Sequence, residues 1–158
     1  METRLNPYNA APKAFQAMLA FSDYAKSCGL EQPLLALVEL RASQINGCAY
    51  CIDMHTKDAR AAGESEQRLY LLDAWRESPV YTERERAALE WTEALTKVTE
   101  GHVPDDVYQR VARHFTPEEL VNLSMAVNVI NSWNRLNVAF RTIAGGYQPA
   151  AAHAKATA

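Results

Sequence analysis

Apolar residues recur along this chain at the three- and four-residue spacing of amphipathic helices, and the alternation that is typical of strands is almost absent. Glycine and proline separate the apolar runs at intervals that suit helices. No repeat of fixed period interrupts this pattern. The pattern therefore predicts an all-α fold of about seven helices.

Capping residues place the ends of the expected helices. Thr82 with Glu85 and Thr116 with Glu119 have the spacing of capping boxes, and each opens a long helix. The predicted helices cover residues 12–27, 33–46, 48–62, 65–78, 82–101, 104–115 and 117–143. The last one is apolar around much of its circumference, which favours burial on several sides and a subunit contact. We expect one helical domain over residues 1–146 and a flexible tail over residues 147–158.

Composition narrows the classes of function without indicating one. The 158 residues suit a single domain, and the net charge of −3 comes with no run of lysine or arginine that would bind nucleic acid. No apolar stretch approaches the roughly 20 residues that span a bilayer. The first nine residues lack the apolar core of a signal peptide. We therefore expect a cytoplasmic protein that binds neither nucleic acid nor membrane.

The candidate chemistry lies in the motif Cys48-x-x-Cys51-x-x-x-His55. At 3.6 residues per turn these three side chains share one face of the predicted helix 48–62. The break at Asn46-Gly47 places Cys48 at the helix start, where free backbone N–H groups lower a thiol pKa. His55 supplies either a nearby cation or a base. Two thiols and a proton carrier are what the reduction of a hydroperoxide or a disulfide requires.

Two other interpretations of this motif stay open. The thiols could be packed core residues beside a satisfied histidine. Zinc could also bind the cluster, with Cys28, His102 or His114 as a fourth ligand, although none of these has ligand-like spacing.

The segment 40–56, LRASQINGCAYCIDMHT, resembles the superfamily of the alkylhydroperoxidase AhpD and carboxymuconolactone decarboxylase. The similarity extends through residues 90–96, EWTEALT, and residues 131–135, NSWNR. It is strongest to the single-domain peroxidase-related branch, because the C-x-x-C-x-x-x-H motif is specific to the AhpD-like members. The resemblance implies an all-helical fold, assembly into trimers or hexamers, and no bound metal or organic cofactor.

The resemblance also implies roles for the individual residues. Cys51 would react with the peroxide, Cys48 would resolve the product and exchange with an external dithiol, and His55 would relay a proton. From its position nearer the helix start, however, Cys48 is expected to have the lower pKa. The two assignments are compatible if Cys48 exchanges with the reductant while Cys51 meets the peroxide.

This chain departs from AhpD at two positions of the motif. Ala36 stands where AhpD has its relay glutamate, and Tyr50 stands where AhpD has a histidine before the second cysteine. Glu39 or Glu93 could supply the missing carboxylate, and the apolar neighbours of Glu93 favour a semi-buried, functional position for it. Tyr50 could donate a hydrogen bond to a sulfur or a peroxide oxygen.

The sequence therefore predicts a thiol-dependent peroxidase or disulfide oxidoreductase, with a hydroperoxide substrate and an external dithiol reductant. One alternative is lactone decarboxylation with His55 as acid or base, which would survive replacement of both cysteines. The other is a non-catalytic redox-sensing oligomer, whose Cys48–Cys51 disulfide alters packing without turnover.

Overall fold

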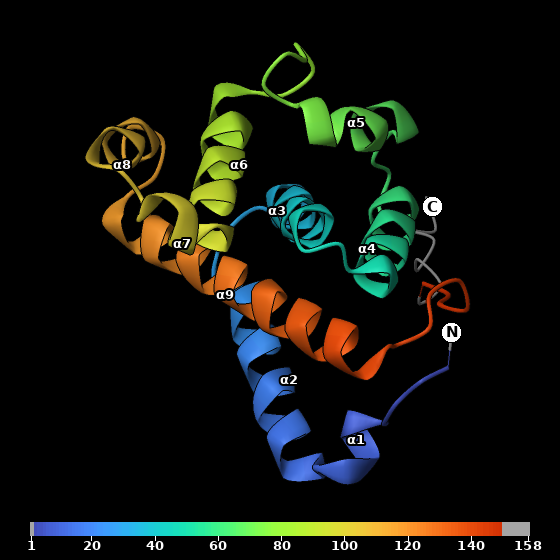
Figure 1. The fold of residues 1–158 in the computed structure, drawn as a ribbon. Helices are drawn as coiled ribbons and strands as arrows, with labels where there is room; N and C mark the ends of the chain where they lie inside the picture. Colours follow the sequence, from blue (N-terminus) through green and yellow to red (C-terminus); the bar gives the residue numbers. More distant parts are fainter. Residues whose placement is uncertain (1, 150–158) are drawn as a thin grey trace, which may run out of the picture.

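The computed structural model describes residues 2–149, and every regular element within that range is helical (Figure 1). The α-helices are α1 (Pro7–Ala10), α2 (Pro12–Ser27), α3 (Gln32–Ile45), α4 (Ala49–Ala61), α5 (Glu66–Leu71), α6 (Glu83–Thr96), α7 (Val98–Gly101), α8 (Asp105–Val111) and α9 (Pro117–Phe140). A short 3-10 turn, η1 (Leu72–Ala74), follows α5. The all-α prediction is confirmed.

Helix α3 is the central element, and it contacts α4, α6 and α9 (Figure 1). Its apolar residues serve two separate core clusters. Leu34, Leu35 and Val38 pack with α6 and α9, whereas Leu37 and Leu40 pack with α4, α5 and η1. A helix that is buried on opposite sides cannot shift without disturbing both clusters. The C-terminal end of α3, where the turn into α4 begins, is therefore held in place.

Both predicted capping boxes are present, at Thr82–Glu85 and at Thr116–Glu119. The predicted helix 82–101 is instead two helices, because Lys97 leaves helical geometry with φ −103° and ψ 34°. Helix α1 was not predicted, since its four residues are too short for a periodic pattern.

Helix α9 ends at Phe140, three residues before the predicted end at 143. Arg141 adopts a left-handed conformation there, with φ 55° and ψ 54°. The N-terminal segment binds this helix end, because the backbone N–H of Arg4 donates to the carbonyl of Phe140 at 3.1 Å. That contact satisfies a carbonyl which α9 leaves without an intrahelical partner.

The segment after α9 returns to the outer face of α4. Lys57 donates to the carbonyls of Gly145 and Tyr147, and the Tyr147 hydroxyl donates to Asp58 at 2.8 Å. The expected tail thus begins at a residue that is hydrogen-bonded to the domain, and residues 150–158 of it lie outside the described residues.

Helix α9 is not covered on all sides within one chain. Val121, Met125 and Val138 of this helix are between 38% and 56% exposed. None of the helices between residues 2 and 149 combines the length and apolar character needed to cross a membrane.

Candidate active site

The turn between α3 and α4 holds Cys48 in place. Gly47 has a φ of +64°, the left-handed conformation that ends many helices. The N–H of Cys48 donates to the carbonyl of Ser43 at 3.0 Å, and that of Gly47 donates to Gln44 at 3.1 Å. These two bonds form a Schellman motif, so the residue that completes the end of α3 is also the N-cap of α4. The position of Cys48 is therefore fixed from both helices.

The two sulfur atoms meet at the first turn of α4. The backbone N–H of Cys51 donates to Cys48 Sγ at 3.4 Å, and both residues are only 1% exposed. A hydrogen bond from the Cys51 thiol lowers the pKa of Cys48 to about 7, against the opposing effect of burial. The Cys51 backbone N–H, Asn134 and the charge of His55 lower that pKa further.

The same hydrogen bond with Cys48 raises the pKa of Cys51, and burial raises it further. Cys48 is therefore the sulfur of the pair that ionises first, and its thiolate accepts a hydrogen bond from the Cys51 thiol. This arrangement agrees with the pKa order expected from the helix start, and it places the more reactive sulfur on Cys48.

Titration of the pair offers a direct check. In a Cys28→Ser background, we expect one thiol per chain, that of Cys48, to ionise between about pH 6 and 8. The second sulfur should stay protonated to above about pH 9, because its pKa is raised. Ultraviolet thiolate absorbance measures both steps, and the urea-unfolded chain is the control, in which both thiols should titrate near the ordinary 9.0. Joint titration in the folded chain would contradict this arrangement.

His55 lies two turns into α4 and is paired with α3. Its Nδ1 is 3.2 Å from Glu39 Oε2, and the two side chains are 11% and 21% exposed. Its other nitrogen, Nε2, is buried and has no hydrogen-bond partner among the described residues. The charge of the imidazole lowers the pKa of Cys48, so His55 acts electrostatically on the cysteine pair while its Nε2 stays without a partner within residues 2–149.

Of the two candidate carboxylates, the structure brings only Glu39 to His55. Glu93 instead accepts hydrogen bonds from Trp75, at 2.8 Å, from Arg76 and from Arg41, at 2.9 Å. Burial alone would raise the pKa of Glu93, but these three donors hold it below its ordinary value. Glu93 is therefore the anion of a structural ion-pair network, and its apolar neighbours in the sequence reflect burial of that network.

Replacing Glu93 by glutamine is expected to lower the free energy of unfolding by about 2 kcal/mol, because Arg41 and Arg76 lose their shared carboxylate. Urea denaturation measures this change. Glu90→Gln is the matched control, since Glu90 is on the same helix but its partner Arg110 is half exposed. The control should lose less stability, and an equal loss in both variants would contradict the structural assignment of Glu93.

Tyr50 lies on α4 between the two cysteines and is half-buried. Burial raises its pKa, and the charges of Cys51 and Asp53 raise it further. Tyr50 is thus a protonated phenol near the sulfur pair, suited to donate a hydrogen bond rather than to act as a base. Ala36, at the position of the AhpD relay glutamate, packs against the second core cluster.

Sequence reasoning missed two residues of α9 that face the sulfurs. Asn137 donates from Nδ2 to Cys51 Sγ at 3.4 Å, and the buried Asn134 lowers the pKa of both cysteines through its side-chain amide. Their signal in the sequence is the three-residue spacing of Asn131, Asn134 and Asn137.

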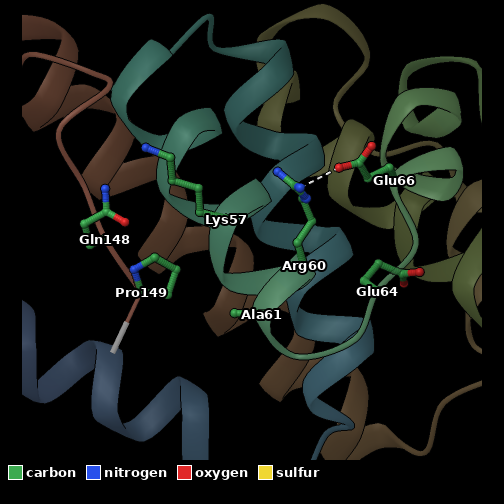
Figure 2. Close-up of a pocket in the computed structure, with 7 residues that line it drawn as sticks. All are labelled: Lys57, Arg60, Ala61, Glu64, Glu66, Gln148 and Pro149. Atoms are coloured by element: carbon green, nitrogen blue, oxygen red, sulfur yellow. Dashed lines mark ion pairs between the residues drawn. The ribbon is translucent and has the colours of Figure 1, made fainter. Parts of the chain in front are cut away.

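A surface hollow of about 630 Å³ lies elsewhere on α4, and Figure 2 shows the residues that line it. Arg60 and Glu66 form an ion pair across it at 2.5 Å, and Gln148 and Pro149 close one side. Neither sulfur lines this hollow. In the described part of the chain, no three Cys, His, Asp or Glu side chains are grouped as metal ligands.

Comparison with known proteins gives consistent matches. A family model described as "Carboxymuconolactone decarboxylase family" matches residues 12–94. The uncharacterized protein YdfG of Bacillus subtilis is 44% identical over 139 residues, which are 88% of this chain and 95% of YdfG.

Two solved structures share the fold. A protein of unknown function from Agrobacterium tumefaciens, whose name suggests the antioxidant defence protein AhpD, has a TM-score of 0.90 and 48% identity over 92% of this chain and 100% of its own. A peroxidase-related protein from Ralstonia eutropha, described as an alkylhydroperoxidase AhpD core, has a TM-score of 0.77 and 19% identity over 88% of this chain and 74% of its own. The second likeness concerns the fold alone.

Proposed function

The chain belongs to the AhpD-like and carboxymuconolactone decarboxylase superfamily, and from the geometry of its cysteine pair we propose that it is a thiol-dependent peroxidase. The observation that carries the proposal is the position of Cys48 at the N-cap of α4, where its sulfur accepts a hydrogen bond at 3.4 Å from the backbone N–H of Cys51, the residue whose thiol would resolve the oxidised form. His55 is paired with Glu39, and its charge lowers the pKa of Cys48.

The proposed cycle begins when Cys48 Sγ attacks an oxygen of the hydroperoxide ROOH. The O–O bond breaks, Cys48 becomes a sulfenic acid, and the leaving alkoxide takes a proton from His55 to form the alcohol. Cys51 then attacks the Cys48 sulfur, which forms the disulfide and releases water. An external dithiol reduces this disulfide and is itself oxidised.

The burial of both sulfurs favours this function over the reduction of protein disulfides. Because Cys48 and Cys51 are only 1% exposed, a small hydroperoxide and a small dithiol suit the site better than the surface of a folded protein.

Steady-state consumption of an organic hydroperoxide, with dithiothreitol supplied, tests the proposal. We expect turnover by the wild-type chain and none above the uncatalysed rate by the double variant Cys48→Ser/Cys51→Ser. Oxidation of the pair without turnover would contradict peroxidase function and favour a redox sensor. The double variant with retained lactone decarboxylation would favour the decarboxylase instead.

The proposal includes assembly into a trimer or hexamer. Val121 and Met125 leave apolar surface exposed on α9, and Leu19 is 43% exposed on α2, which contacts α9. Light scattering coupled to gel filtration should give three or six times the mass of 17.6 kDa, and a monomer would contradict this part.

A further inference from the structure

Three asparagines of α9 face the turn between α3 and α4. Asn131, Asn134 and Asn137 follow one another at intervals of three residues, so they lie along one side of the helix. Asn131 and Asn134 are buried, and Asn137 is half-buried. Side-chain amides are costly to bury unless each one has a hydrogen-bond partner.

The orientation of the Asn134 amide is fixed by its neighbours. Asn46 donates to Asn134 Oδ1 at 2.8 Å, and Asn134 Nδ2 donates to Ser43 Oγ at 3.0 Å. Ser43 in turn donates to the carbonyl of Glu39 at 2.7 Å. Because its oxygen is held by Asn46 and its nitrogen by Ser43, the Asn134 amide has one fixed orientation, in which it lowers the pKa of both cysteines.

Asn137 has a simpler position. Its Nδ2 donates to Cys51 Sγ at 3.4 Å, and this sulfur is the hydrogen-bond partner of its side chain among the described residues. Cys48 Sγ has a different donor, the backbone N–H of Cys51. Each sulfur thus has its own donor, and Asn134 acts on both.

We propose that Asn137, supported by Asn134, stabilises Cys51 as the leaving thiolate when the Cys48–Cys51 disulfide is reduced. A thiolate of the external dithiol attacks Cys48 Sγ and forms a mixed disulfide. The Cys48–Cys51 bond breaks, and its electron pair goes to Cys51 Sγ, where the Asn137 amide donates to the new charge. The Cys48 charge that raises the pKa of Cys51 in the reduced pair is absent at this step, because Cys48 is then part of the mixed disulfide. The second thiol of the reductant then releases Cys48 and closes the disulfide of the reductant.

This inference rests on the proposed function only in taking the Cys48–Cys51 disulfide as the oxidised form. It assigns the two sulfurs different donors for different steps. Donors on Cys48 serve the attack on peroxide, whereas the Asn137 donor on Cys51 serves the return to the reduced state. Reduction should therefore depend on Asn137 more strongly than oxidation does.

Reduction can be measured separately from oxidation. The disulfide is formed with oxidised glutathione, which needs no peroxidase activity, and its reduction by dithiothreitol is monitored by rapid quenching and thiol counting. Asn137→Ala should slow reduction about tenfold, because the leaving thiolate loses a charge-assisted hydrogen bond. Asn137→Asp, which has the same shape, should slow reduction further, because a carboxylate then faces the departing charge.

Asn122→Ala is the matched control. Asn122 is a buried asparagine of the same helix, bonded to Tyr24 and to the Cys28 carbonyl, away from the redox pair. It should lose stability and keep the wild-type rate of reduction. Wild-type rates in both Asn137 variants, or equal slowing in the Asn122 control, would overturn the proposal. Failure of peroxide alone to form the disulfide would contradict the proposed function and leave this measurement intact.

Discussion

Replacing Cys48 by serine is expected to lower peroxide turnover by about 10³-fold or more, because a serine hydroxyl is hardly ionised at neutral pH and cannot form a disulfide. Replacing Cys51 by serine should have a different result. The serine hydroxyl can still donate to the Cys48 thiolate, so a single oxidation remains, and the enzyme then stalls because no second thiol can resolve it.

Stopped-flow oxidation and trapping of sulfenic acid with dimedone separate the two variants. Cys51→Ser should consume one equivalent of hydroperoxide and carry the trapped group on Cys48, whereas Cys48→Ser should carry none. Cys28→Ser is the control, since Cys28 packs against the other core cluster and should leave turnover unchanged. A trapped group on Cys51 in the Cys48→Ser variant would reverse the two roles, to those which the family resemblance implies.

Replacing His55 by asparagine is the second large expected effect. We expect kcat/KM for the hydroperoxide to fall about 10²-fold, because the leaving alkoxide loses its proton donor. Glu39→Gln should lower it about tenfold, since Glu39 orients the imidazole through Nδ1 and leaves Nε2 without a partner in the described part of the chain.

Initial rates of hydroperoxide reduction, recorded over a range of pH, give kcat/KM for both variants. Glu93→Gln is the control for Glu39→Gln, because Glu93 is held by Arg41, Arg76 and Trp75 and should affect stability instead of rate. A wild-type rate in His55→Asn would mean that water alone protonates the alkoxide, and it would remove His55 from the mechanism.

The helical framework was predictable because its signals are local. Pro12 and Gly29 bound α2, and two capping boxes open α6 and α9 where they were expected. The break at Asn46-Gly47 likewise placed Cys48 at the start of α4. The end of α9 was not predictable in this way, because the left-handed residue that ends it is Arg141 and not the glycine that usually marks such a position.

The surroundings of the cysteine pair depend on packing between helices, and the sequence left them open. Both Glu39 and Glu93 have apolar neighbours in the sequence, yet Arg41 and Trp75 bind Glu93, while Glu39 meets His55 across the contact between α3 and α4. Asn137 was missed for the same reason, since nothing local links it to a sulfur 86 residues earlier.

The proposed peroxidase chemistry is tested most sharply by the mass and disulfide map of the intact chain after one equivalent of an organic hydroperoxide. We predict rapid loss of two thiols per chain, one alcohol formed per peroxide, and a peptide that links Cys48 to Cys51 while Cys28 stays reduced. Thiols that react no faster than free cysteine, or a chain that carries no Cys48–Cys51 link, would contradict this chemistry.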